Sequence, residues 1–323
     1  MTTIRTSCAS LAALALLLLA GAPVQAGDLL NLSTRAFVGT GENVLIGGFT
    51  ITGTEPKPVI IRAIGPSMNG LVLNVLNDPM LDLFKSDKVG DAQRASLQSS
   101  DDWRDGQEVE VETTKLAPTD DYEAAMIVKL APGSYTAVVR GYARSSGMAL
   151  IDVNEAGTSA SRLTTMSSRG QVQPGDAALI GGFTVSGSDT RVLLRAIGPT
   201  LNRRHVGNPL SDTTLELRDA NGLLLEANDD WRSDNEQAIR ATGLAPTDDR
   251  ESAILRTITP GTYAAIVRGK EDKTGIALVE VYRLPSRSVE PFNSQLTAPP
   301  ILPLNPQMRE NDVTEGFPVT PKN

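Results

Sequence analysis

The amino-acid sequence predicts an all-β protein made of two tandem β-sandwich domains of the jelly-roll type. Three observations lead to this prediction. The chain of 323 residues contains two similar copies of one unit, each about the size of an ordinary domain. Short runs rich in Val, Ile and Thr recur in each copy and end at Gly, Gly-Pro or Asn-Gly. Aromatic residues make up 4% of the chain and glycines number 28, which is typical of aliphatic cores joined by turns.

The two copies share motifs in the same order. SDDWRDGQEVEVETTKLAPTDDYEAA at residues 100–125 matches NDDWRSDNEQAIRATGLAPTDDRESA at residues 228–253 at 14 of 26 positions without a gap. LIGGFT begins at Leu45 and Leu179, and RAIGP begins at Arg62 and Arg195. A PG[ST]Y[TA]A[VI]VRG run and a G[MI]AL[IV][DE]V run close each unit. We define copy one as residues 31–156 and copy two as residues 163–284, joined by a small polar linker and with extra loop residues around 87–96 of copy one.

Each copy has the pattern of seven or eight short strands, with turns every 8–12 residues as in a sandwich or jelly roll. LELRDANGLLLEA at residues 215–227 predicts a hairpin around Asn-Gly. TYAAIVRG at 262–269 alternates side chains between two faces of a strand. Only DNEQAIRAT at 234–242 indicates a helical turn, and it lies inside the repeated 26-residue stretch.

The two ends of the chain differ from the copies. Residues 1–26 have the three parts of a secretory signal peptide, with Arg5, the apolar run LAALALLLLA and a small-residue site at VQA. Cleavage after Ala26 removes Cys8, the only cysteine, so the mature chain has no disulfide. Residues 285–323 contain eight prolines and predict an extended, disordered tail. The tail is interpreted as a spacer, with a partner-binding segment as the alternative.

Charge and hydropathy limit the partners of the mature chain. Its net charge changes from −8 to −9, because Arg5 is the only charged residue of the signal segment. An acidic exported chain is a poor candidate for binding nucleic acid or anionic membranes. No apolar stretch after residue 26 is long enough to cross a bilayer. We therefore expect a soluble secreted protein, in the periplasm, outside the cell or at its surface.

The order of motifs in copy two, LELRDANGLLLEANDDW, then ITPGTYAAIVRG, then TGIALVEVY, resembles the bacterial pre-peptidase C-terminal domain. In that family a hairpin leads into an Asp-rich loop, followed by a PGxY strand and a Gly-led terminal strand. The fuller order, from IGGF through RAIGP and NDDWR to ALVEVY, is similar to a repeat in predicted secreted proteins of environmental bacteria. The resemblance covers both copies and implies a β-sandwich accessory or adhesive module. This chain has a longer segment after DDW, which puts a transfer of loop function in doubt.

Most catalytic constellations are missing from the sequence. The only histidine, His205, has no counterpart in copy one, and the mature chain has no cysteine, so Ser-His-Asp, Cys-His and His/Cys zinc sites are excluded in that copy. The glycine-rich residues 39–48 lack the Gly-Lys-Ser/Thr ending of a phosphate loop. Paired carboxylates remain as a hydrolase alternative, in which Asp102 or Asp230 would act with Glu123 or Glu251.

Calcium is the main functional interpretation of the Asp-rich stretch, because hard cations take carboxylate and carbonyl oxygens. The alternative is that these residues only cap turns and helix starts through side chain to backbone hydrogen bonds. The spacing is not that of an EF-hand, and ligand number cannot be derived from it. The candidate metal ligands are Asp101, Asp102, Asp120, Asp121, Glu123, Asp229, Asp230, Asp248, Asp249 and Glu251.

Two tryptophans and two arginines have a similar choice of roles. Trp103 and Trp231, at equivalent places, are candidates for stacking against a sugar ring or a partner, but a buried loop anchor is the favoured interpretation. Arg62 and Arg195 lie in apolar strands, where an unpaired charge is costly. They either reach an acidic loop such as DDWR or extend into solvent.

From the sequence we expect an exported, non-catalytic binding or structural module of the cell surface or extracellular matrix. Its expected partners are an extracellular polysaccharide or a surface protein, with Ca²⁺ as the candidate cofactor. A secreted hydrolase that uses paired carboxylates is the alternative.

Overall fold

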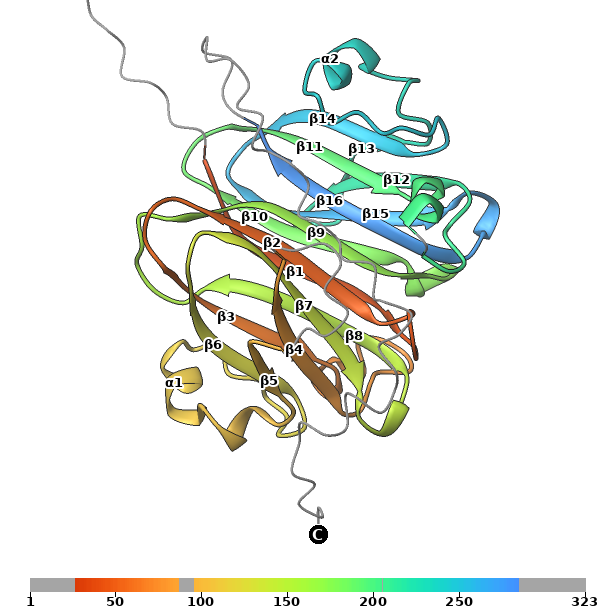
Figure 1. The fold of residues 1–323 in the computed structure, drawn as a ribbon. Coiled ribbons are helices and arrows are strands. Elements are labelled where there is room, and N and C mark those ends of the chain that lie inside the picture. Colours follow the sequence, from red (N-terminus) through yellow and green to blue (C-terminus); the bar gives the residue numbers. More distant parts are fainter. Residues whose placement is uncertain (1–26, 87–95, 205, 285–323) are drawn as a thin grey trace, which may run out of the picture.

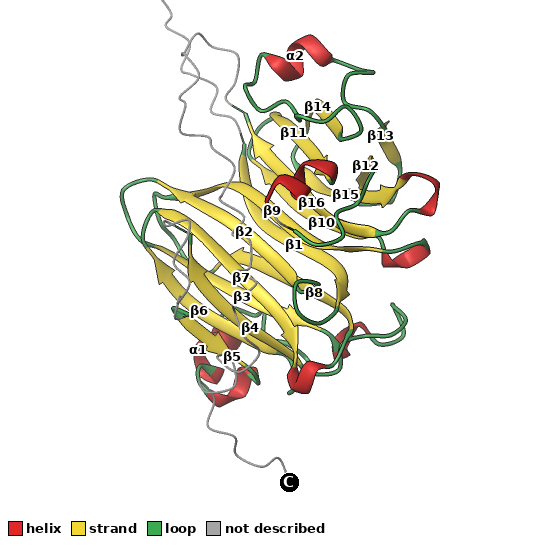
Figure 2. Ribbon diagram, turned by 45° about the vertical axis from the view of Figure 1, so that its right-hand side comes forward, coloured by secondary structure: helices red, strands yellow, loops and turns green. Residues whose placement is uncertain are grey.

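A computed structural model describes residues 27–86, 96–204 and 206–284 (Figure 1). Strands dominate it, which confirms the all-β class (Figure 2). The predicted signal peptide, the predicted tail and His205 lie outside the described residues. Among the helices of the described residues, none has the length and apolar character needed to span a membrane.

The described residues of copy one form eight strands and one α-helix. The α-helix lies inside the repeated 26-residue stretch, between the fifth and sixth strands. The elements are β1 (Asp28–Val38), β2 (Leu45–Thr52), β3 (Lys57–Ile64), η1 (Pro66–Met68), β4 (Pro79–Lys85), β5 (Gln98–Ser100), η2 (Trp103–Asp105), α1 (Glu108–Thr113), β6 (Ala124–Leu130), β7 (Gly133–Gly141), η3 (Tyr142–Arg144) and β8 (Gly147–Glu155).

Copy two repeats this order of strands and α-helix. The elements are β9 (Arg162–Val172), η4 (Gly175–Ala177), β10 (Leu179–Ser186), β11 (Thr190–Ile197), η5 (Pro199–Arg204), β12 (Thr213–Asp219), β13 (Leu224–Asn228), α2 (Glu236–Arg240), β14 (Ser252–Ile258), β15 (Gly261–Gly269), η6 (Lys270–Asp272) and β16 (Gly275–Arg283).

Local sequence explains the hairpin and the short helix that were predicted in copy two. Strands β12 and β13 pair antiparallel around the Asn-Gly turn. Asp219 closes that turn, because its Oδ1 accepts hydrogen bonds from the backbone N–H groups of Asn221 and Leu223, each at 2.9 Å. Gly222 has φ of +79°, a conformation that glycine adopts without steric cost. The predicted helical turn at 234–242 is confirmed as α2, and its only buried side chain is Ile239.

Within each copy, strand pairing gives two four-stranded layers. In copy one, one layer has the order β6-β3-β8-β1 and the other β2-β7-β4-β5, all antiparallel. In copy two, the matching layers are β14-β11-β16-β9 and β10-β15-β12-β13. The layers touch closely at glycines: a Cβ added to Gly47 would lie 3.0 Å from Ile151 of the opposite layer. Each copy is therefore a sandwich with equivalent pairings.

The copies are joined by an exchange of strand partners. β1 of copy one pairs with β10 of copy two, and β9 of copy two pairs with β2 of copy one. The result is two antiparallel sheets, each with four strands from each copy. Sheet I has the order β6-β3-β8-β1-β10-β15-β12-β13, and sheet II has the order β14-β11-β16-β9-β2-β7-β4-β5. β1 and β9 also touch in parallel at two residue pairs, which links the sheets.

One hydrophobic core extends through both copies. It contains residues from both ends of the described chain, such as Leu32 of β1 and Val281 of β16. At its centre the Thr34 and Ser168 hydroxyl oxygens lie 2.6 Å apart, on the equivalent strands β1 and β9. That each copy is an independent domain stays a prediction, and the shared core is the reason to test it.

Candidate functional site

The repeated 26-residue stretch forms a loop that closes on itself at one end of each sandwich. In copy one it leaves β5, passes through η2 and α1 and returns to β6. The backbone N–H of Trp103 donates to the carbonyl of Glu123 at 2.9 Å, and Trp231 donates to Glu251 at the same distance. The DDWR and TDDxE blocks therefore meet in both copies, as the sequence predicted.

The two tryptophans anchor these loops. The indole Nε1 of Trp103 donates to the carbonyl of Asp120, and that of Trp231 donates to the carbonyl of Asp248, each at 3.1 Å. Trp103 is 2% exposed and Trp231 is 1% exposed, each in an apolar cluster beneath the loop. A ring that is buried to this extent has no free face for a sugar, so the geometry supports the anchor and not the stacking role.

An arginine that follows each tryptophan neutralises the second aspartate of TDD. The Arg104 Nε lies 2.6 Å from the Asp121 Oδ1, and the Arg232 Nε lies 2.5 Å from the Asp249 Oδ1. The guanidinium of Arg104 also stacks 4.1 Å from the Trp103 ring centroid. Asp121 and Asp249 are therefore engaged in surface ion pairs that hold the loop closed.

The glutamate of the TDDxE block is buried in both copies and accepts hydrogen bonds from the protein. Glu123 is fully buried, and its Oε1 accepts from the backbone N–H groups of Gly65 and Ser67, each at 2.9 Å. Its Oε2 accepts from the Ser67 hydroxyl at 2.6 Å. Glu251 is also fully buried and accepts from the Thr200 N–H at 2.9 Å. These carboxylates tie the loop to the Gly-Pro turn that follows β3 or β11.

Asp120 and Asp248 act as turn caps. The Asp120 Oδ1 accepts from the Tyr122 N–H at 3.0 Å, and the Asp248 Oδ1 accepts from the Arg250 N–H at 3.1 Å. The Arg250 guanidinium adds two hydrogen bonds to Asp248, and these lower the pKa of that carboxyl group. For these two of the ten proposed metal ligands, the geometry is that of turn chemistry.

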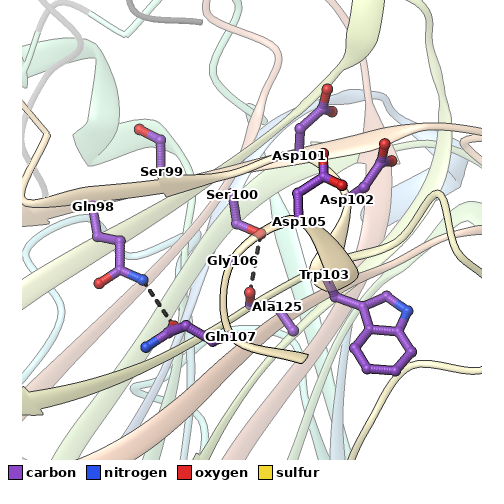
Figure 3. A pocket seen from close by; sticks show the side chains of 10 residues that line it. All are labelled: Gln98, Ser99, Ser100, Asp101, Asp102, Trp103, Asp105, Gly106, Gln107 and Ala125. Atoms are coloured by element: carbon purple, nitrogen blue, oxygen red, sulfur yellow. Dashed lines mark hydrogen bonds between the residues drawn. The ribbon is translucent and has the colours of Figure 1, made fainter. Parts of the chain in front are cut away.

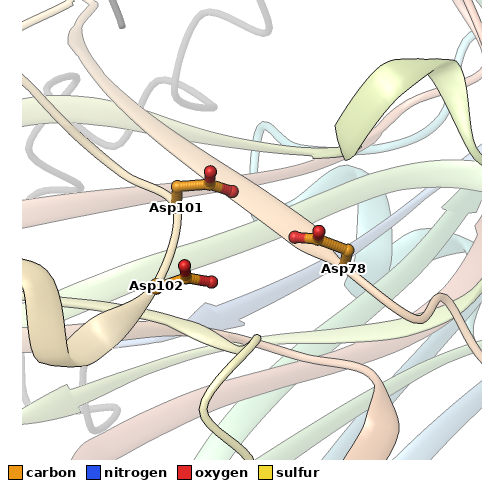
Figure 4. A group of neighbouring side chains, drawn as sticks. All are labelled: Asp78, Asp101 and Asp102. Atoms are coloured by element: carbon orange, nitrogen blue, oxygen red, sulfur yellow. The ribbon is translucent and has the colours of Figure 1, made fainter. Parts of the chain in front are cut away.

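The first two aspartates of each stretch lie elsewhere, beside an acid that the sequence analysis did not include. Carboxylate oxygens of Asp78, Asp101 and Asp102 lie within 4.8 Å of one another (Figure 4). Asp78 stands just before β4 and points toward the other two across the sandwich edge. We call this group the copy-one triad. Three carboxylate oxygens at this separation form a set that suits a hard cation such as Ca²⁺.

A cavity of about 190 Å³ adjoins the copy-one triad (Figure 3). Asp101, Asp102 and Asp105 stand on one side of it. Two hydrogen bonds join residues that line the cavity. The Gln98 Nε2 donates to the Gln107 Oε1, and the Ser100 hydroxyl donates to the Ala125 carbonyl, each at 3.0 Å. Most of the residues that line the cavity have polar side chains, and two of them, Asp101 and Asp102, belong to the triad.

The equivalent copy-two triad is Asp212, Asp229 and Asp230, again within 4.8 Å of one another. Here lysines of η6 and the residue after it take part: the Lys270 Nζ lies 2.7 Å from the Asp229 Oδ2, and the Lys273 Nζ lies 3.8 Å from the Asp212 Oδ2. The Oδ1 atoms of Asp212 and Asp229 are buried and find no hydrogen-bond partner among the described residues. Desolvation raises the pKa of Asp212 above its ordinary value.

Arg62 and Arg195 each connect the terminal strand of a copy to the loop. The Arg62 Nε donates to the Asp152 Oδ1 at 2.9 Å, and its Nη1 donates to the Leu116 carbonyl at 2.6 Å. In copy two, Arg195 makes the same bonds to Glu280 and to the Leu244 carbonyl. The arginines thus reach the loop through its backbone, while their carboxylate partners lie on β8 and β16.

No protein-family model matches the chain, and no curated protein matches it.

Proposed function

We propose that the protein is an exported, non-catalytic module of the cell surface or extracellular matrix, which binds Ca²⁺ at its two acidic triads. The observation that carries this proposal is the recurrence of three converging carboxylates at equivalent positions of the two sandwiches. Isolated surface acids are common, but here the same triad forms twice, each time from the residue before β4 or β12 and the two aspartates of the DDWR block.

The buried oxygens of the copy-two triad give further support. A buried carboxylate oxygen without a hydrogen bond is costly, and an ion or water is the usual explanation. The Asp212 and Asp229 Oδ1 atoms are two such oxygens among the described residues. A cation with two or three carboxylate ligands and water would supply the missing contacts, as Ca²⁺ does in flexible oxygen sites.

A non-catalytic role is supported by the position of the two glutamates. In the hydrolase alternative, Glu123 or Glu251 would exchange a proton with a substrate or a water. Both are fully buried, and each accepts hydrogen bonds from the Gly-Pro turn. A general acid or base must be within hydrogen-bond reach of the substrate, and these carboxylates face the protein.

The order of motifs that resembles the pre-peptidase C-terminal domain supports the same class of module. A carbohydrate or a surface protein would bind at the edge of the sandwiches where the triads lie, with Ca²⁺ either as a direct bridge or as the support of the loop. The side chains of Gln, Ser and Asp that line the cavity beside Asp101 offer hydrogen-bonding groups to a hydroxyl-rich ligand.

Calorimetry with the mature chain, residues 27–323, tests the metal. We expect CaCl₂ to bind and to raise the melting temperature, with a stabilisation of roughly 2.7 kcal/mol at a hundredfold excess over the dissociation constant. The double variants D101N/D102N and D229N/D230N should each remove one binding event. The matched control is Asp234→Asn, an exposed acid outside both triads, which should change neither. If Ca²⁺ causes no heat and no thermal shift, the metal proposal is wrong.

A panel of extracellular polysaccharides tests the partner and the hydrolase alternative together. The same purified chain is incubated with each polymer in Ca²⁺ and in chelator, and both retained protein and released reducing ends are measured. We expect Ca²⁺-dependent retention without hydrolysis. Hydrolysis that disappears in Glu123→Gln would overturn the non-catalytic assignment. Export is tested separately by deleting residues 1–26, which should keep the protein in the cytoplasm.

A further inference from the structure

One row of side chains on the outer face of sheet II is buried, although the outer face of a sandwich commonly faces solvent. Strand pairing places five residues in register across strands β16, β9, β2, β7 and β4. All five are only 2–5% exposed. The row consists of Leu278, Arg169, Ile46, Val138 and Asp82.

These side chains point away from the core. On β9, Ser168 bonds Thr34 of the opposite sheet and Gly170 faces Ala36, so Arg169 between them projects outward. On β7, Ala137 and Val139 belong to the core, so Val138 also projects outward. An outward face of an antiparallel sheet is usually solvated, which makes this burial informative.

The equivalent row on sheet I behaves differently. The register there places Leu150, Arg35, Ile180, Ile266 and Glu216 across strands β8, β1, β10, β15 and β12. Every one of these five is partly exposed. The two rows lie on equivalent strands of the two copies, in the same register, and their residues are closely similar. At the two ends of the row, described residues provide the cover: Leu278 packs with Leu201 and Val206, and Asp82 is bonded by Ser99 and Arg140. The burial of the central three, Arg169, Ile46 and Val138, therefore calls for a cover that occurs once in the chain and not once in each copy.

The buried row also contains polar groups that need a partner. The Arg169 Nε and Nη2 and the Ser167 Oγ, which projects from the same face of β9, find no hydrogen-bond partner among the described residues. Burial lowers the pKa of Arg169 to about 10, and the nearby Glu42 only partly offsets this. Buried arginines are normally paired with an anionic group. Beside them, Val44, Ile46 and Val138 form an apolar patch against which Phe84 packs.

We propose that residues 285–323 of the same chain dock across this row, with a carboxylate on Arg169 and apolar side chains on the patch of Ile46 and Val138. This segment begins directly after Leu284, where β16 ends beside β9. It carries both types of side chain that the row requires: four acids, Glu290, Glu310, Asp312 and Glu315, and the apolar run PPILPL.

The segment is long enough to reach the row. Tyr282 pairs with Thr165, so Arg169 lies four residues further along β9, about 13 Å away at the strand rise of 3.3 Å per residue. Glu290 follows Leu284 by six residues, which span up to roughly 20 Å when extended. The first carboxylate of the segment can therefore reach Arg169 without strain. The prolines favour an extended chain that can lie along a sheet face.

Thiol accessibility tests this proposal, because the mature chain has no cysteine. A single cysteine is introduced at Val138, with Ile266→Cys on the equivalent row as the matched control. In the full mature chain we expect V138C to react with a maleimide about tenfold more slowly than I266C, since thiol reactivity follows exposure. In a chain that ends after Leu284, the two rates should become similar. Equal rates in the full chain, or unchanged protection of V138C after truncation, would overturn the proposal.

A second variant keeps the test decisive if the shortened chain does not fold. In it the full length is retained, and every apolar and acidic residue of 285–323 is replaced by serine. V138C should again become as reactive as I266C. Persistent protection in this chain would assign the cover to another part of the protein, such as residues 87–95, and would refute docking of the C-terminal segment.

Discussion

Copy one and copy two have the same strands and the same loop, but they stabilise equivalent buried charges differently. Arg195 of copy two pairs with Glu280, and Tyr282 bridges the two. The Arg195 Nη2 donates to the Tyr282 hydroxyl, and this hydroxyl donates to the Glu280 Oε1, each at 2.8 Å. In copy one the corresponding residues are Arg62, Asp152 and Asn154. The carboxylate of copy two is 1% exposed and that of copy one 7%. The more deeply buried pair, Arg195 and Glu280, thus has one more hydrogen-bonding group, the Tyr282 hydroxyl.

The acidic triads also differ between the copies, in this case at the surface. Copy two has Lys270 within an ion-pair distance of Asp229, and Tyr142 stands at the equivalent position of copy one. The triad geometry is retained while the adjacent side chain changes. The comparison indicates that the loop framework of Trp, Glu and Arg is fixed by packing, whereas the charge around the triad is adjustable within the same fold.

The largest effect is expected when the copies are separated. A chain of residues 27–157 loses the β1–β10 and β2–β9 ladders and half of the shared core, so two long strand edges become exposed. We expect no folded monomer: the fragment should be unfolded or associated. Light scattering after size exclusion, with a thermal melt, measures this against residues 27–323. A monomer that unfolds cooperatively would restore the view of two independent domains.

Truncation of the loop anchors should give the next largest effect. Trp103→Ala and Trp231→Ala each remove a buried indole and its hydrogen bond, at a cost of about 3–5 kcal/mol in the free energy of unfolding. Urea denaturation measures both. If the framework is equivalent in the two copies, the two losses should be similar, and the double variant should lose their sum because the two rings do not touch. A neutral effect of either change would mean that its loop is not held by the ring.

The buried ion pairs distinguish the copies. Arg195→Met leaves Glu280 charged and almost inaccessible to solvent, and should cost about 3 kcal/mol. Arg62→Met leaves the more exposed Asp152 and should cost less. The double variant R195M/E280L should recover most of the loss, because it removes both charges. Chemical denaturation of the four chains measures the order, and a larger loss for R62M would contradict the comparison.

The smallest effect concerns the pH dependence of the copy-two triad. Desolvation raises the pKa of Asp212, so in chelator the folded state holds this proton more tightly than the unfolded state. That contribution to stability is present below the ordinary pKa of aspartate and is lost as the pH rises through the raised value. Asp212→Asn should therefore gain stability relative to the parent chain as the pH increases across this window. Melting temperatures at a series of pH values, with Asp234→Asn as the control, measure the difference.

The sequence contained much of the fold because its signals are local. The Asn-Gly turn, the Gly-Pro strand ends and the repeated motifs depend on residues close together in the chain, and they predicted the hairpin, the helical turn and the equivalent copies. The exchange of β1 and β9 was not predictable in this way. Strand order is set by which edges of the two sandwiches meet, and both edges have the same alternation of side chains.

The candidate site was predicted in part for a similar reason. The meeting of DDWR and TDDxE followed from two repeated blocks that flank a variable segment. Asp78 and Asp212 were missed, because they lie outside the repeated stretch, although each directly precedes an equivalent strand and that position is a detectable signal. The sequence also grouped all ten acids, whereas burial divides them into turn caps, surface ion pairs, buried loop ties and the two triads.

The two ends of the described chain lie side by side, since the Arg283 Nε donates to the Gly27 carbonyl at 2.6 Å. The acidic triads lie at the other end of the strands, where β7 and β15 finish at Gly141 and Gly269. Strand β1 alone, with eleven residues, spans about 35 Å between these poles. A molecule held at the pole where residues 27 and 283 meet would thus have both triads directed away from the point of attachment.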